Sequence, residues 1–328
     1  MRKRQLSLCD FLEAPPAVRP PRGPVEVWDL FCGAGGFSAG AVEAGCVVAF
    51  ACDSDEQALD VHKLNHPETT HWHCTLPRDD IPFPSDGRSF HVHGSPPCQR
   101  FSLASGQRGN SKDAVQRAES MVEWYIRTAL SSGASSWSME QVASQPVIAI
   151  VERFRMENQA AVDWGVFRME LLGVPQTRRR LIAGSKELIS NLKRMESSLP
   201  RRSVRDAIPR CRGTHIRNAK AWVKQREVPT RDGKKIVYEK AKWTDCCQPV
   251  SGPAPTILAH RNLTWVTMTN SEEVETHTGL SLEEAAALQT FPPRYKLPTS
   301  STLGIRLVGN AVPPRVAALL LGGKPPRD

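Results

Sequence analysis

Residues 25–66, "VEVWDLFCGAGGFSAGAVEAGCVVAFACDSDEQALDVHKLNH", decide the fold class of this chain. The pattern predicts strand, turn, helix and strand, in that order, over residues 25–30, 33–36, about 37–43 and 47–52. Asp53 and Asp55 follow the second strand, about 20 residues after the glycines. Glycines at such a turn let the backbone approach a ligand, and the later acid can hold a pair of ribose hydroxyls. The stretch therefore predicts a nucleotide-binding βαβ unit.

The alternation of strands and helices continues along the chain. "SFHVHGS" (89–95) and "SSWSMEQV" (135–142) read as strands, with a helix over 113–133 between them, and residues 166–185 read as two strands joined at 173–175. This order predicts a parallel, doubly wound α/β sheet. Ligands bind beyond the carboxyl ends of such strands, so we expect Cys98, Glu140 and the glycine turn to share one cleft.

Length and composition limit the class of protein. The 328 residues, 40% of them hydrophobic, are enough for one large domain and a smaller one. No apolar run approaches the roughly 20 residues that span a bilayer, and the basic N-terminus lacks the apolar core of a signal peptide. Nine cysteines without a framework spacing indicate reduced thiols and an intracellular protein.

The positive charge of the chain is concentrated in one segment. The net charge is +9, but residues 186–250 alone hold 17 lysines and arginines against 7 acids. The rest of the chain is therefore nearly neutral. Such asymmetry points to a polyanionic partner, most often nucleic acid, although a charged segment can also be only a solvated surface.

Six blocks of sequence carry a resemblance to a known family. They are "DLFCGAGGFSAG" (29–40), "GSPPCQRFS" (94–102), "MEQV" (139–142), "GVPQTRRRLIAG" (173–184), "LSLEEAAALQTFPPRY" (280–295) and "RLVGNAVPPRVAALLL" (306–321). In order and spacing they resemble the DNA (cytosine-5)-methyltransferases, in particular the compact enzymes of bacteria and viruses, including those of restriction–modification systems.

The resemblance implies a domain plan. A catalytic domain of residues 25–185 plus 302–325 would form a doubly wound, Rossmann-like sheet that binds S-adenosylmethionine. Residues 186–301 would form a hinge and a small, mostly irregular or β target recognition domain, and residues 1–24 a flexible tail and Pro-rich linker. The last helix would then pack back on the first domain, in a protein expected to be a monomer.

The resemblance also assigns the chemistry. Cys98 corresponds to the nucleophile that adds to carbon 6 of a flipped-out cytosine in a short DNA sequence, which activates carbon 5 for methylation. Glu140 corresponds to the carboxyl that holds the ring edge, and Arg178 and Arg180 to the arginines that add positive charge near the base carbonyl. The two prolines before Cys98 would hold the nucleophile rigidly, and the polar segment after it resembles a lid.

For the cofactor, the family pattern assigns ten residues to S-adenosylmethionine and its product S-adenosylhomocysteine. They are Phe31, Gly33, Ala34, Gly35, Gly36, Asp53, Ser54, Pro97, Asn310 and Val312. Two positions depart from the family pattern. Gln141 replaces the usual Asn, which leaves the support of the catalytic loop open, and Cys74 stands where the family has an acid near the adenine.

The basic segment coincides with the family's target recognition region. Six arginines are candidates for phosphate or base contacts on duplex DNA, namely Arg201, Arg202, Arg205, Arg210, Arg212 and Arg217. No metal site is predicted, because Cys211, His215 and the adjacent Cys246 and Cys247 have poor spacing for zinc.

Two alternatives use the same fold. A transfer-RNA cytosine methyltransferase would typically carry a Cys-Phe-Thr signature in the recognition region, and this sequence has none. A catalytically inactive DNA-binding relative would tend to lose the nucleophile or the cofactor turn, and both are intact.

Residues 4–12 resemble a peptide that docks on replication sliding clamps. Gln5, Leu8 and Phe11 have the required spacing, with Leu12 where a second aromatic residue is commoner. A disordered tail with chance apolar residues explains the same stretch equally well.

Overall fold

The computed structural model describes residues 24–97, 112–196, 198–218, 224–230, 233–239, 247–260, 262–269 and 272–323. Cys98 and the clamp-like residues 4–12 lie outside these ranges. In the described part of the chain, no helix combines the length and the apolar character that crossing a membrane requires.

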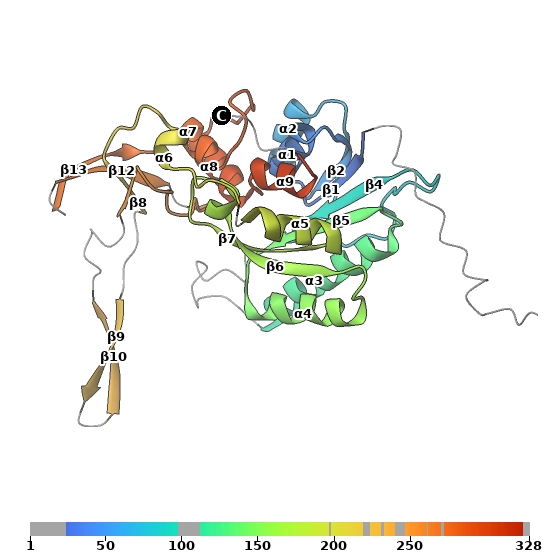
Figure 1. Ribbon diagram of the computed structural model, residues 1–328, viewed down its shortest axis with the longest axis horizontal. Helices are drawn as coiled ribbons and strands as arrows, with labels where there is room; N and C mark the ends of the chain where they lie inside the picture. Colours follow the sequence, from blue (N-terminus) through green and yellow to red (C-terminus); the bar gives the residue numbers. More distant parts are fainter. Residues whose placement is uncertain are drawn as a thin grey trace, which may run out of the picture.

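The larger part of the molecule is built on one seven-stranded sheet, seen through the middle of Figure 1. The strand order is β3-β2-β1-β4-β5-β7-β6. The strands are β1 (Glu26–Leu30), β2 (Val47–Asp53), β3 (Thr70–His73), β4 (Phe90–Gly94), β5 (Ser136–Gln141), β6 (Asp163–Arg168) and β7 (Arg179–Gly184). β1 pairs in parallel with β2 and β4, so the chain order reverses beside β1. A ligand site is expected at this switch point.

The sheet is mixed, which corrects the expectation of an all-parallel sheet. β7 runs antiparallel to both β5 and β6. The reason is the short link between β6 and β7, which contains only the 3-10 turn η3 (Met169–Leu172) and an extended stretch. A parallel pair needs a crossover of a dozen or more residues, whereas an antiparallel pair does not. The two strands joined at residues 173–175 were otherwise predicted correctly.

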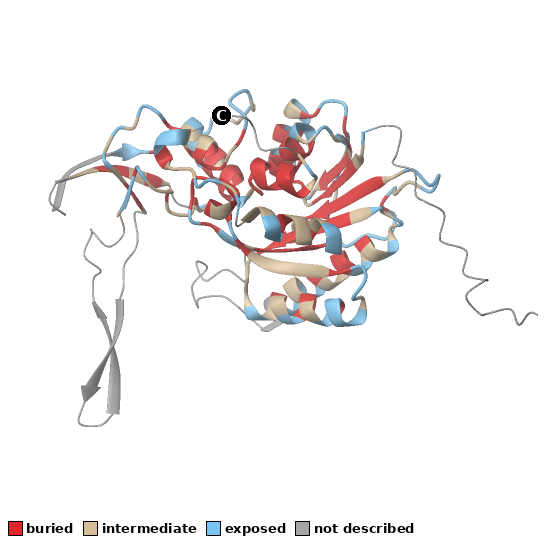
Figure 2. Cartoon of the chain, viewed as in Figure 1, coloured by how far each residue is buried: buried red, intermediate tan, exposed pale blue. Residues whose placement is uncertain are grey.

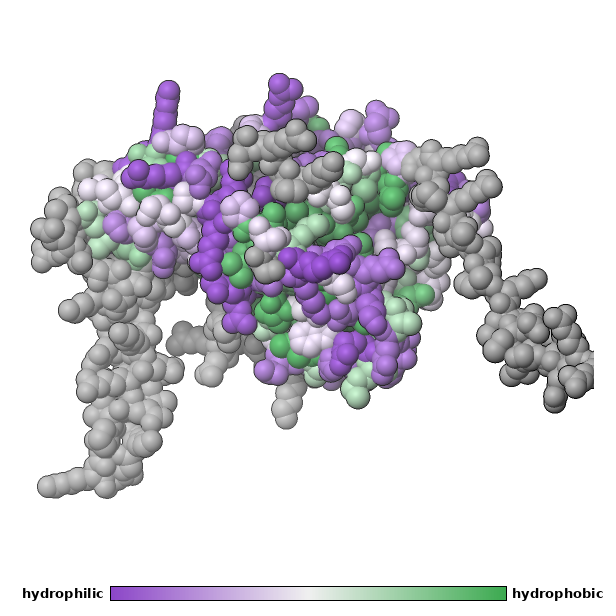
Figure 3. Space-filling view, in the orientation of Figure 1, coloured by the Kyte–Doolittle hydropathy of each residue, from purple (hydrophilic) through white to green (hydrophobic). Residues whose placement is uncertain are grey.

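Helices cover both faces of this sheet. α3 (Lys112–Ser131) and α4 (Gln145–Glu157) pack on one face, where Tyr125 and Phe154 belong to the main hydrophobic core. α1 (Gly36–Glu43), α5 (Lys186–Glu196) and α9 (Pro314–Leu320) pack on the other face. α2 (Glu56–Asn65) lies against β2 and β3. Figure 2 shows the buried residues gathered between these layers, and Figure 3 shows hydrophilic side chains over α5.

The C-terminal helix returns to the first βαβ unit, as the family resemblance implied. In Figure 1 the red α9 lies beside the blue α1. Gly40 permits this approach, because a Cβ atom there would lie 2.1 Å from the carbonyl oxygen of Pro314. Seven consecutive residues of α9 are buried, so its packing energy comes from nearly its whole surface. α1 and α9, which lie more than 270 residues apart in the sequence, are thereby joined in one domain.

The smaller part of the molecule has its own core and is rich in antiparallel strands. Its four-stranded sheet has the order β11-β8-β12-β13, and β9 and β10 form a separate pair. These strands are β8 (His215–Asn218), β9 (Lys224–Thr230), β10 (Gly233–Glu239), β11 (Cys247–Pro249), β12 (Leu263–Thr269) and β13 (Glu272–Gly279). Trp265 is fully buried between this sheet and the helices α6 (Val204–Ala207), α7 (Leu282–Leu288) and α8 (Ser301–Asn310).

Candidate active site

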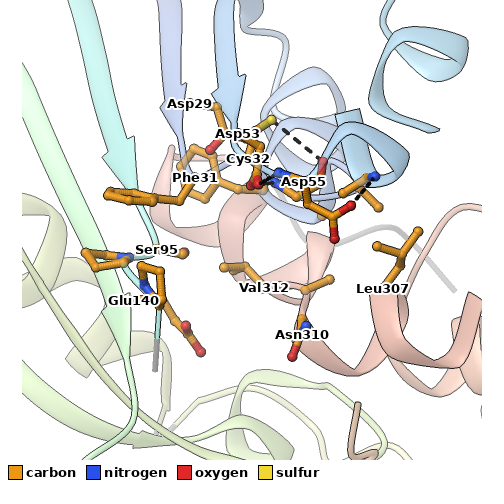
Figure 4. A pocket seen from close by; sticks show the side chains of 18 of the residues that line it. Asp29, Phe31, Cys32, Asp53, Asp55, Ser95, Glu140, Leu307, Asn310 and Val312 are labelled. Carbon is orange, nitrogen blue, oxygen red and sulfur yellow. Dashed lines mark hydrogen bonds between the residues drawn. The ribbon is translucent and has the colours of Figure 1, made fainter. Parts of the chain in front are cut away.

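A pocket opens at the switch point of the sheet (Figure 4). It is lined by residues from the ends of β1, β2, β4 and β5, and by residues 306–312 of the C-terminal segment. Nine of the ten predicted cofactor residues line it: Phe31, Gly33, Ala34, Gly36, Asp53, Ser54, Pro97, Asn310 and Val312. Glu140 lines the same pocket. The tertiary structure therefore brings together blocks that lie up to 280 residues apart in the sequence.

Asp53 ties the glycine turn to the second strand. One carboxylate oxygen accepts the Gly33 N–H and the other accepts the Asp55 N–H, both at 2.8 Å. Burial raises the pKa of this carboxyl, and the backbone donors partly oppose that shift. Each oxygen retains a second lone pair, so the acid can still accept hydroxyl donors from a ligand.

The turn itself is shaped for close contact with a ligand. Gly33 has φ of +53°, and a Cβ atom built on it would meet no atom within 4 Å, so open space adjoins the backbone. Phe31 has φ of +61°, an unusual conformation for a bulky residue. Its ring lies edge-on to Trp124, with the ring centroids 6.2 Å apart. Backbone strain of this kind concentrates at binding sites.

A buried hydrogen-bonded chain runs from the pocket towards the surface. Ser38 donates to Asp29 at 2.6 Å, His62 Nε2 lies 2.9 Å from the Ser38 hydroxyl, and His62 Nδ1 lies 2.8 Å from His71 Nε2. Because the Ser38 proton goes to Asp29, His62 Nε2 must donate to Ser38. Burial raises the pKa of the Asp29 carboxyl to about 7 and lowers the pKa of His62.

Arg306 was missed in the sequence and also lines the pocket. Its guanidinium pairs with Asp55, the N-cap of α2. Burial alone would raise the pKa of Asp55, but the hydrogen bond from Arg306 and the backbone donors of α2 lower it. Arg306 stands four residues before Asn310, and that helical spacing is the signal that could have revealed it.

Glu140 lines the pocket, and Arg180 contacts it from the neighbouring strand β7. Arg180 Nε lies 2.8 Å from Glu140 Oε1, and both side chains are largely buried. Oε1 forms this ionic contact but has no hydrogen-bond partner among the described residues. This arrangement brings Glu140 and Arg180, two of the predicted catalytic residues, into direct contact.

Gln141 supports the chain just before Cys98. Its Nε2 donates to the Pro96 carbonyl at 2.9 Å, and its Oε1 accepts the Val142 N–H at 2.7 Å. The side chain thus joins β5 to the Pro-Pro turn. The structure describes this turn as far as Pro97, which lines the pocket.

Arg178 differs from its expected role. Its side chain is 1% exposed, and the guanidinium donates to the carbonyls of Gly309 at 3.1 Å and Ile257 at 3.4 Å. It does not line the pocket. Strand geometry explains the difference, because Arg178 comes just before β7 while Arg180 lies within it and faces Glu140. Arg178 therefore joins three segments instead of facing a base.

The six arginines predicted to contact DNA divide into two groups. Arg201, Arg205 and Arg210 are exposed, and Arg202 is half-buried with a hydrogen bond to the Asp206 carbonyl. One other corrects the expectation, because Arg217 is only 7% exposed within the smaller part of the molecule. Arg212 is exposed, although it pairs with Glu284 and lies over the Trp265 ring at 5.9 Å, so its contact with DNA stays a prediction.

The fold is a mixed α/β sheet whose switch-point pocket combines a glycine turn, Asp53 and an acid–arginine pair. A family model described as C-5 cytosine-specific DNA methylase matches residues 25–126 and 147–322. This covers most of the chain, which therefore belongs to the C-5 cytosine-specific DNA methylase family. Members of this family transfer a methyl group to carbon 5 of cytosine in DNA.

Individual relatives agree with this assignment. The chain is 26% identical over 317 residues to Type II methyltransferase M1.HphI of Haemophilus parahaemolyticus, covering 88% of this chain and 83% of that protein. It is 24% identical over 317 residues to Type II methyltransferase M.HgiDI of Herpetosiphon aurantiacus, covering 89% and 91%.

Solved structures share the fold. The S. pombe Dnmt2 methyltransferase has a TM-score of 0.59 at 15% identity, with 91% of this chain and 97% of that chain covered. A putative DNA modification methyltransferase from an E. coli prophage has a TM-score of 0.58 at 20% identity, covering 91% and 98%.

Proposed function

We propose that the pocket binds S-adenosylmethionine and that the chain methylates carbon 5 of a cytosine flipped out of duplex DNA. One observation carries the proposal: the glycine turn, Asp53 and Glu140 line a single pocket. A methyl donor held by the first two would thus lie next to a base held by the third.

The donor set of the pocket fits this cofactor. Asp53 offers lone pairs to ribose hydroxyls, and the open space beside Gly33 leaves room for a ligand against the backbone. Phe31 supplies an apolar ring at the same wall. When bound, S-adenosylmethionine supplies an electrophilic methyl group carried on a sulfonium ion.

Cys98 would activate the base. Carbon 5 of cytosine is a weak nucleophile, and addition of the thiolate to carbon 6 pushes electron density onto carbon 5. After the methyl group is accepted there, loss of the carbon-5 proton and departure of the thiolate restore the aromatic ring. Gln141 supports this role, because its bond to Pro96 fixes the chain two residues before the nucleophile.

Glu140 and Arg180 would control the charge on the ring. The buried carboxyl can hold the N3 and amino edge of the base, which stabilises the adduct that forms on addition. Arg180 orients that carboxyl from the neighbouring strand and adds positive charge. The pocket lies inside the sheet domain, so the target base must leave the DNA stack to reach it.

Duplex DNA would lie across the smaller part of the molecule. The exposed Arg201, Arg205 and Arg210 are suited to neutralise phosphates, and the strong positive charge of residues 186–250 supports this placement. Residues 4–12 form a separate proposal. We propose that they bind a replication sliding clamp, and calorimetry of a residue 1–20 peptide against the clamp tests it, with no binding at about 100 μM as the contrary result.

Methyl transfer from labelled S-adenosylmethionine to duplex DNA and to total RNA, followed by mapping of the modified position, tests the main proposal. We expect label on carbon 5 of cytosine in DNA. Label in RNA alone would favour the transfer-RNA alternative, and no label in either substrate would favour an inactive relative.

A further inference from the structure

Tyr295 lies in the connection between α7 and α8 and belongs to two environments. Its ring packs in the core of the smaller part, with the Phe291 ring centroid 4.9 Å away. Its hydroxyl reaches the glycine turn of the sheet domain, where it donates to the Ala34 carbonyl at 2.6 Å. A single side chain thus connects the second core to the wall of the pocket.

The hydrogen bonds of this phenol have one consistent assignment. A tyrosine hydroxyl has one proton, which points to the Ala34 carbonyl at 2.6 Å, with the Gly35 carbonyl at 3.2 Å as a second, longer acceptor, so His66 Nε2 at 3.2 Å must be the donor to the phenol oxygen. Burial lowers the pKa of His66 to about 4 and raises the pKa of Tyr295. Both groups are therefore neutral near pH 7, as this arrangement requires.

The turn is shaped around the phenol. Gly35 has φ of +85°, and a Cβ atom there would lie 2.3 Å from the Tyr295 oxygen. Only glycine therefore permits both the backbone conformation and the close approach. The residues on either side of Gly35, Ala34 and Gly36, line the pocket.

The backbone next to Tyr295 is fixed independently. The Asn65 amide donates to the Lys296 carbonyl at 2.9 Å and accepts the Lys296 N–H at 2.7 Å. Because Asn65 and His66 end α2, this helix end holds both the backbone and the phenol of the connection. The hydroxyl therefore meets the turn at a defined point.

We propose that Tyr295 is a positioning residue for the cofactor turn. By holding the Ala34 carbonyl, its hydroxyl fixes the peptide that joins Ala34 to Gly35, and with it the direction of the backbone groups that face the ligand. This inference rests on the proposed use of the pocket for S-adenosylmethionine. Under this proposal, the affinity of the pocket for the cofactor depends in part on Tyr295, a residue that does not line the pocket.

Tyr295→Phe tests the proposal, because it removes the hydroxyl and keeps the ring in the core. Calorimetry should show S-adenosylhomocysteine binding weakened about fivefold to tenfold, the factor for one buried hydrogen bond. In steady-state assays the KM for the methyl donor should rise by a similar factor. The kcat and the KM for DNA should stay within twofold, since no other described residue of the pocket changes.

Tyr125→Phe is the matched control. Tyr125 is also a buried phenol in the sheet domain, and it donates to the Ser138 carbonyl at 2.7 Å, but it does not line the pocket or contact the turn. Its loss should lower the melting temperature and leave S-adenosylhomocysteine affinity within twofold. Equal weakening in both variants would mean a merely structural role and would overturn the proposal.

The wild-type measurement separates this inference from the function on which it rests. If the wild-type chain binds S-adenosylhomocysteine and Tyr295→Phe binds it equally well, only the role of Tyr295 is refuted. If the wild-type chain binds none, the cofactor pocket is refuted, and the role of Tyr295 with it.

Discussion

Arg180 Nε lies 2.8 Å from Oε1 of Glu140, a residue that lines the pocket, and this pair connects two neighbouring antiparallel strands. β5 ends next to Glu140, while β7 begins next to Arg180, so the antiparallel pairing places both at the same end of the sheet. An all-parallel sheet would not bring these ends together. The antiparallel direction of β7, which the sequence did not predict, therefore places Arg180 beside Glu140.

Glu140→Gln should reduce methyl transfer by about 10²–10⁴-fold, the range for loss of a general acid or base. The amide keeps the size of the side chain but cannot share a proton with the base. S-adenosylhomocysteine binding by calorimetry should be preserved. Glu170→Gln is the control, because Glu170 is also buried and paired with an arginine, Arg168, but lies outside the pocket. A loss below about threefold for Glu140→Gln would exclude this role.

Cys98→Ser should abolish methyl transfer and leave cofactor binding intact, because a serine hydroxyl is far less nucleophilic than a thiolate. With DNA that contains 5-fluorocytosine, the wild-type chain should form a covalent complex that survives denaturing electrophoresis, since fluorine cannot leave as a proton does. Cys46→Ser, at a partly buried thiol away from the pocket, should behave as wild type. Near-normal turnover of Cys98→Ser would remove the nucleophile assignment.

Arg178→Met should lower stability, whereas Arg180→Met should lower turnover, although the two residues stand only two positions apart. Arg178 is buried and donates to two carbonyls, so its loss should lower the free energy of unfolding by about 3 kcal/mol. Arg180→Met should lower turnover with little effect on stability. Denaturant unfolding and turnover would be measured on both, with the exposed Arg179→Met as the stability control. Equal destabilisation by Arg178→Met and Arg179→Met would contradict the structural role of Arg178.

Asp29 should make stability depend on pH. Burial raises its folded-state pKa to about 7, above the unfolded value near 4, so the folded state holds the proton more tightly. The contribution is complete below about pH 4 and is lost as pH rises towards 7. Asp29→Asn should remove this dependence and gain on the order of 3 kcal/mol over the wild type at pH 8, with little difference near pH 4. Parallel unfolding curves for the two proteins across this range would disprove the shift.

Substitutions of Arg210 and Arg212 should affect different properties, the first DNA binding and the second thermal stability. Arg210→Ala should weaken duplex binding and reduce the slope of log affinity against log salt by about 1, because it removes one phosphate contact. Arg212→Ala should lower the melting temperature, because Arg212 pairs with Glu284 and covers Trp265. Titration at several salt concentrations, with thermal melts of both variants, gives the comparison. An unchanged salt slope for Arg210→Ala would place the DNA elsewhere.

The amino-acid sequence alone determined the first βαβ unit, because this unit depends on local signals. The glycines at 33–36 and the acid at Asp53 each specify a turn or a strand end by their own residue types. Because parallel strands deliver their carboxyl ends to one edge, such signals were enough to predict that Glu140 and the glycine turn would share one cleft. The return of the C-terminal helix and the pocket residues of the "GNAVPP" block were predicted from the resemblance of these blocks to the methyltransferase family.

Only the tertiary structure decided which polar side chains face the pocket and which support the core. Arg178 and Arg217 look like catalytic or surface arginines in sequence, yet both are buried by neighbours from other segments. The direction of β7 and the position of Tyr295 likewise depend on partners 40 to 260 residues away. Burial and hydrogen bonding are properties of packed surroundings, and a residue's own type does not reveal what will surround it.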